Sequence, residues 1–286
     1  MKNINWIILL ILIIYLIYIF IFKYIYNSDM NGNTYIITVL EMDVNNKKIE
    51  KQIKVIKIDK NIENFHVKQN IDYYVITMFS PDRLANIETQ IKKMKDTGID
   101  MNMNYVDAVV GKDIDIDDLI SKNMLTSNIY ENKDSNFTHV FEKRKNEVGC
   151  YMSHLKIYDM IKNKGNDDGY SIIFEDDFQI NDDFSNILEQ TLLKLDGYDF
   201  DMLFLGMIGN LGDNIMDNIY YTTIGSYCCH AYLVNNKKIG KIISAMKYID
   251  TIVDGTIFIK GHNKELTVLR ISPNIAEQGG FGTTIR

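Results

Sequence analysis

The amino-acid sequence predicts an α/β fold in which a mostly parallel sheet is covered by helices on both faces. Strands buried on both faces are near-continuous apolar runs, and DYYVITM (72–78) and DMLFLG (201–206) are of this kind. Segments with a helical spacing of apolar residues lie between such runs from about residue 71 onward. Regular alternation of strands and helices is typical of parallel sheets, whose ligands bind beyond the carboxyl ends of the strands.

The first helix of this region has clear start and stop signals. Ser80 is a suitable N-cap residue, and Pro81 suits the first helical position. Gly98 is a typical stop signal. By the same apolar runs and spacings we expect further strands at 104–110, 171–174 and 201–206, and further helices at 147–165, near 183–195 and at 235–248.

The N-terminal segment predicts a membrane anchor. From Trp6 to Phe22 the sequence WIILLILIIYLIYIFIF carries no charge and lies between Lys2 and Lys23. Its helical length is about 25 Å, and the flanking tyrosines extend it toward the ~30 Å of a bilayer core. A cleaved signal peptide is the alternative, although its apolar region is usually shorter and no small-residue cleavage site follows. We therefore expect residues 1–26 to form a single-pass anchor in a membrane, with its sidedness left open by the nearly balanced lysines.

A stem and the main domain follow. Residues 27–70 contain two alternating stretches around Asn45-Asn46, which predict a β-hairpin and then a linker. Residues 71–286 are long enough to form one domain with a sizeable core. The net charge of −7 argues against a nucleic-acid partner.

Three consecutive acidic residues follow the apolar strand SIIF (171–174). Glu175, Asp176 and Asp177 would repel one another, by about 4 kcal/mol for two charges ~4 Å apart at an effective dielectric of ~20. Protonation, splaying into water or a bound cation can relieve such repulsion. Taken alone, this acidic triplet is equally compatible with a helix N-cap, a solvated loop or a metal site.

Four motifs in order give the triplet its context. They are VITMFSPDR (Val75–Arg83), DAVVG (Asp107–Gly111), EVGCYMSH (Glu147–His154) and EDD (Glu175–Asp177). Over roughly residues 71–180 the chain resembles glycosyltransferase family 25, which includes bacterial lipopolysaccharide transferases and procollagen galactosyltransferases. Downstream of residue 180 the resemblance is looser. There the segments DMLFLG and CCHAYLVNNKKIGKII are the counterparts of family sequence.

The resemblance implies a GT-A fold with a Rossmann-like half that binds a nucleotide-sugar donor, and an Mn²⁺ or Mg²⁺ ion at the acidic motif. Both ions prefer oxygen ligands and commonly use one or two protein carboxylates. Alternate residues of an extended chain face the same side, so we expect Glu175 and Asp177 to bind the metal. Asp176 is expected to point the other way and to support the donor site.

The remaining site residues are expected partly from their positions in the sequence and partly from the resemblance. Arg83 lies where a helix N-terminus suits a donor phosphate, and a solvent-facing arginine is the alternative. His154 is expected to be catalytic, with a structural histidine as the alternative. Asp254 is the candidate general base of an inverting reaction, or else a surface loop aspartate. The full set of predicted donor contacts is Thr77, Arg83, Asp107, Ser153 and Asp176.

These observations predict a membrane-anchored, metal-dependent hexosyltransferase. The expected donor is a UDP-hexose, with galactose from UDP-galactose favoured. The expected acceptor is a hydroxyl group on a glycan, a lipid-linked saccharide or a hydroxylysine-bearing protein. Two alternatives stay open: a non-catalytic protein of the same fold that binds a nucleotide sugar or glycan, and a transferase of a different sugar.

Overall fold

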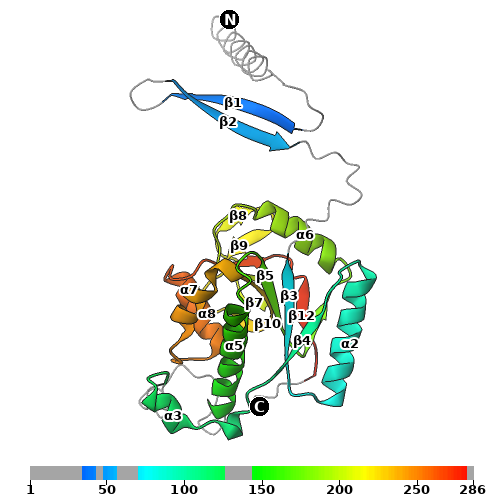
Figure 1. Cartoon of the computed structure of the whole chain (residues 1–286), viewed down its shortest axis with the longest axis vertical. Helices are drawn as coiled ribbons and strands as arrows, with labels where there is room; N and C mark the ends of the chain where they lie inside the picture. Colours follow the sequence, from blue (N-terminus) through cyan, green and yellow to red (C-terminus); the bar gives the residue numbers. More distant parts are fainter. Residues whose placement is uncertain (1–33, 43–47, 57–69, 126–143, 282–286) are drawn as a thin grey trace, which may run out of the picture. The chain divides into compact units, whose positions relative to one another are not determined.

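The computed structural model describes residues 34–42, 48–56, 70–125 and 144–281 of a chain that divides into two compact units, 1–66 and 67–286. In the first unit, β1 (Thr34–Met42) pairs antiparallel with β2 (Lys48–Ile56), which confirms the predicted hairpin strands (Figure 1). The predicted Asn45-Asn46 turn and the predicted membrane segment lie outside the described residues. Within the described parts of the chain, no helix has the length and apolar character needed to cross a bilayer.

The second unit is built on a mixed sheet in the strand order β4-β3-β5-β10-β7-β11-β9-β8 (Figure 1). A smaller sheet pairs β6 with β12 in antiparallel fashion. The strands of the large sheet are β3 (Ile71–Thr77), β4 (Met103–Asp107), β5 (Tyr170–Glu175), β7 (Met202–Ile208), β8 (Asn214–Met216), β9 (Ile219–Tyr221), β10 (Tyr227–Asn235) and β11 (Val268–Ile271). Those of the smaller sheet are β6 (Phe178–Ile180) and β12 (Ala276–Gln278).

The predicted strands correspond to β3, β4, β5 and β7, although β4 ends at Asp107 rather than at residue 110. Strand β3 runs parallel to β4 and β5, and β7 runs parallel to β11. Strand β10 is not among the predicted strands, and it inserts antiparallel to both β5 and β7. This inserted strand makes the centre of the sheet antiparallel, so that the fold is α/β with a mixed sheet.

Helices cover both faces of this sheet. Residues of α5, α7 and α8 form a buried cluster with one face, and residues of α2 and α6 form a second cluster with the other (Figure 1). Ser80 is the N-cap of α2 and Pro81 is its first residue, as predicted. The helices are α2 (Pro81–Asp96), α3 (Ile116–Ser121), α5 (Arg144–Lys164), α6 (Phe184–Lys194), α7 (Ile239–Met246) and α8 (Val253–His262), with 3-10 turns at Gly111–Asp113 and Asn236–Lys238.

Helix α5 packs closely against the loop that follows β4. A Cβ atom at Gly149 would lie 2.5 Å from the carbonyl oxygen of Val109, so only glycine permits this approach. One turn later, the Ser153 hydroxyl donates to the Gly149 carbonyl at 2.8 Å and accepts from the Val109 amide at 2.8 Å. The EVGCYMSH motif therefore holds the 108–111 loop against α5, and this contact shapes one wall of the cavity described next.

Candidate active site

A cavity of about 210 Å³ lies at the carboxyl ends of β3 and β5. Seven of the nine predicted site residues line it, because the ends of the parallel strands β3 and β5 meet there beside residues of α2 and α5. Of the described residues predicted to form the site, Asp107 and Asp254 are the two outside this lining. The lining comprises Ile76–Met78, Arg83, Ala108–Gly111, Asn146, Cys150, Ser153, His154, Glu175–Asp177 and Gln278.

The acidic triplet lies across a turn rather than along an extended strand. Strand β5 ends at Glu175, and Asp176 and Asp177 form the turn into β6. Asp176 and Asp177 both contact Nη1 of Arg83, at 3.1 and 3.3 Å. The prediction that Asp176 points away from Asp177 is therefore wrong, because alternation of side chains holds only while the backbone stays extended.

Arg83 is buried beneath the triplet, with 5% of its surface exposed. Besides its two ion pairs, its guanidinium carbon lies 5.0 Å from the ring centre of Phe281. This burial contradicts the alternative of a solvent-facing arginine. The expected contact with a donor phosphate stays a prediction; what the structure shows is that Arg83 pairs with two carboxylates in the lining of the cavity.

Two further side chains of α2 hold the turn in place. The amide group of Asn86 donates to the carbonyl oxygens of Asp176 and Phe178, each at 3.0 Å. Gln90 accepts from the Ile180 amide at 3.1 Å and donates to Asn86 at 3.3 Å. Neither residue was predicted from the sequence, although two polar residues four positions apart on the buried face of a helix are a recognisable signal.

Asp177 is the most confined of the three carboxylates, with 6% exposed surface. Its Oδ2 accepts from the side-chain amide of Gln278 at 3.1 Å, whereas its buried Oδ1 has no hydrogen-bond partner among the described residues. Burial, together with the negative charge of Glu175, raises the pKa of Asp177. An unpartnered, buried carboxylate oxygen is costly, and a cation placed beside it would remove that cost.

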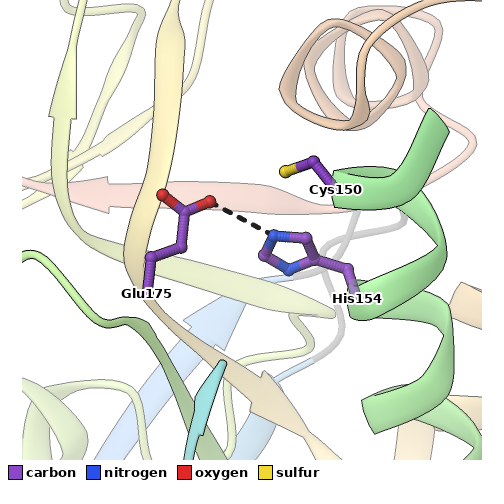
Figure 2. Close-up of side chains that lie close together, drawn as sticks. All are labelled: Cys150, His154 and Glu175. Carbon is purple, nitrogen blue, oxygen red and sulfur yellow. Dashed lines mark hydrogen bonds and ion pairs between the residues drawn. The ribbon is translucent and has the colours of Figure 1, made fainter. Parts of the chain in front are cut away.

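Glu175 faces the other side of the cavity, toward α5. Figure 2 shows Cys150 and His154 projecting from α5 toward Glu175. His154 Nε2 lies 3.3 Å from Glu175 Oε1, and Nδ1 lies 2.7 Å from the hydroxyl of Tyr232. Burial acts to raise the pKa of Glu175, but the hydrogen bond and electrostatic attraction of His154, with the charges of His230 and Arg83, hold it below its usual value.

Cys150 completes a cluster that the sequence analysis missed. Ligand atoms of Cys150, His154 and Glu175 all lie within 4.8 Å of one another (Figure 2). The available signal was the spacing of Cys150 and His154, since residues four apart share one face of a helix. Gln278 was also missed. It lies about a hundred residues beyond Asp177 and has no local signal that links the two.

Thr77 and Ser153 line the cavity with hydroxyl groups that already have partners. The Thr77 hydroxyl accepts from the Phe79 amide at 3.0 Å, and its side chain is also hydrogen-bonded to Asp176. The single hydroxyl of Ser153 already makes the two contacts described above, to the Gly149 carbonyl within α5 and to the Val109 amide of the loop after β4. The donor contacts expected at these two residues stay predictions.

Asp107 and Asp254 lie beside the cavity. Asp107 is exposed at the end of β4, and its carbonyl oxygen accepts from the Lys156 amine at 3.0 Å. Asp254 belongs to the first turn of α8 and not to a surface loop. Its carboxylate accepts from the amides of Cys228 at 2.9 Å and Gly255 at 2.8 Å, and burial raises its pKa.

A comparison with curated proteins gives no match to the chain. A comparison with protein families matches residues 70–257 to glycosyltransferase family 25, described as an LPS biosynthesis protein. The matched range contains all nine predicted site residues and more than half of the chain. The chain therefore belongs to glycosyltransferase family 25.

Proposed function

We propose that this glycosyltransferase transfers a hexose, galactose from UDP-galactose, to a hydroxyl group of a glycan, a lipid-linked saccharide or a hydroxylysine-bearing protein. Family membership supports a nucleotide-sugar donor and a glycan acceptor. The observation that carries the proposal is that Glu175 and Asp177 both line one cavity, where Asp177 Oδ1 is buried without a partner among the described residues.

The proposed divalent cation is Mn²⁺ or Mg²⁺, held by Glu175 and Asp177. The carboxylates fit such an ion, because hard cations take oxygen ligands and complete their coordination with water and phosphate oxygens. When bound, the ion would stabilise the negative charge of the departing nucleoside diphosphate. Arg83 keeps Asp176 and Asp177 oriented, and the packed 108–111 loop supplies the opposite wall of the cavity.

We also propose that the apolar N-terminal segment anchors the enzyme to a membrane. The support for this is the uncharged run from Trp6 to Phe22 and the tyrosines that follow it. An anchored enzyme would act on acceptors at or near the membrane surface.

The donor is identified by incubating the full-length chain, purified in detergent, with a panel of nucleotide sugars in Mn²⁺ or in EDTA. We expect Mn²⁺-dependent release of UDP from UDP-galactose, faster when a galactose-accepting glycan is added. Turnover of another nucleotide sugar would replace galactose in the proposal. Donor binding without turnover in the presence of glycan acceptors would indicate the non-catalytic alternative, and absence of both binding and turnover would overturn the proposal.

Asp254 is the proposed general base that takes the proton of the acceptor hydroxyl. Its raised pKa brings it closer to the range of an efficient base at neutral pH. Asp254→Asn is expected to lower kcat for transfer by about 10²–10⁴-fold while the dissociation constant of the donor stays within twofold.

The matched control for Asp254 is Asp250→Asn, the same change at an exposed residue just before α8. Rates of transfer and donor binding by calorimetry are measured for both variants. An Asp254→Asn enzyme with wild-type kcat would remove Asp254 from the mechanism. A fall in melting temperature that parallels the lost activity would assign it a structural role through its bond to the Cys228 amide.

A further inference from the structure

We propose that Cys150, His154 and Glu175 form a binding site for a zinc-class transition-metal ion that is occupied in the absence of nucleotide sugar. Cys150 and His154 are four residues apart on α5, so they lie on one face of the helix. Glu175 reaches them from the end of β5 (Figure 2). One helix face and one strand end thus converge on a single point.

The spacing of the three side chains suits a tetrahedral ion. Ligand atoms bound at ~2.0–2.3 Å to tetrahedral zinc lie about 3.5 Å apart. His154 Nε2 and Glu175 Oε1 are already 3.3 Å apart, and all three ligand atoms lie within 4.8 Å of one another. All three residues line the cavity, so a fourth coordination position would be open to water or a small ligand.

The ligand chemistry favours a softer ion than Mn²⁺ or Mg²⁺. A thiolate sulfur, an imidazole nitrogen and one carboxylate are the ligand types of zinc, whereas magnesium and manganese prefer sites made of oxygen. With the thiol deprotonated on binding, Cys150 and Glu175 would supply two negative charges. These two charges neutralise the charge of a divalent ion, at a site whose histidine is fully buried.

A hydrogen-bonded chain behind His154 supports this assignment. His154 Nδ1 lies 2.7 Å from the Tyr232 hydroxyl, and that hydroxyl lies 2.9 Å from the hydroxyl of Tyr158. All three side chains are buried. When Nδ1 donates its proton to Tyr232, Nε2 is left as the lone-pair atom that faces Cys150 and Glu175, an arrangement that metal-binding histidines commonly show.

This site differs from the proposed donor-dependent cation site in its ligands and in its independence of nucleotide. Glu175 is shared between the two sites: its Oε1 lies beside His154, and its second oxygen would be left for the other ion. The inference does not rest on sugar transfer. It would stand for a non-catalytic protein, and it can fail while transfer is observed.

Cobalt(II) titration of the metal-free, full-length chain without nucleotide tests the site, because a bound thiolate gives cobalt a charge-transfer band in the near ultraviolet. We expect one equivalent of cobalt, visible bands of tetrahedral intensity, and displacement by equimolar Zn²⁺ but not by excess Mg²⁺. Cys150→Ser should remove the charge-transfer band. Cys228→Ser is the matched control, since both cysteines are half-buried, and it should retain the band.

A second variant tests the site even if Cys150→Ser does not fold. Tyr232→Phe removes only the hydroxyl that holds His154, and it should weaken zinc binding by about 10–100-fold. The proposal is overturned if the wild-type chain binds no cobalt, if the band persists in Cys150→Ser, or if it disappears only in Cys229→Ser. Unchanged zinc affinity in Tyr232→Phe would equally contradict it.

Discussion

An Asp177→Asn variant is expected to lose metal-dependent sugar transfer, with kcat/KM lower by about 10²–10³-fold. Asparagine preserves the size of the side chain and can still accept from Gln278, so the turn should persist. What it removes is the negative charge next to Glu175 and the buried Oδ1 that has no partner among the described residues. A divalent cation on the diphosphate would lose one of its two proposed protein ligands.

Transfer rates and the affinity for Mn²⁺ in the presence of UDP measure this loss. Asp182→Asn is the matched control, because the same substitution is made five residues later at a side chain that is 98% exposed. It should leave both quantities unchanged. If Asp177→Asn transfers sugar and binds Mn²⁺ like the wild type, Asp177 is not a metal ligand.

An Arg83→Met variant is expected to lower the free energy of unfolding by about 3–5 kcal/mol. Methionine retains much of the apolar stem, but it leaves the carboxylates of Asp176 and Asp177 without the guanidinium that contacts both. Removal of one partner from a buried ion pair costs more than the pair itself contributes, since the remaining charges stay desolvated. Added Mn²⁺ should restore part of the loss by binding the native state.

Urea denaturation with and without Mn²⁺ provides the measurement. Lys93→Met removes a cation from the same helix, where Lys93 pairs with exposed Asp182 at 3.5 Å, and it should change stability by at most about 1 kcal/mol. A similarly small effect for Arg83→Met would show that the two carboxylates are already protonated or hydrated. Without a Mn²⁺-dependent recovery, the freed carboxylates would not form a cation site.

The elements predicted correctly are those with local causes. Strands β3, β5 and β7 are apolar runs, and α2 begins where Ser80 and Pro81 specify a helix start. Strand β10 escaped prediction because its place between β5 and β7 depends on pairing with residues far away in the chain. Helix α8 was missed as well, so the alternative interpretation of Asp254 placed it in a surface loop, whereas it lies in a first helical turn.

The sequence by itself determined the family, the motif order and the presence of three adjacent carboxylates after a buried strand. Only the tertiary structure decided how those carboxylates are used, because a two-residue turn redirects Asp176 and Asp177 toward Arg83 and leaves Glu175 facing α5. The contacts of Glu175 with His154 and of Asp177 with Gln278 join distant parts of the chain. Such contacts follow from the packing of helices and strands on the sheet, which no local pattern of residues encodes.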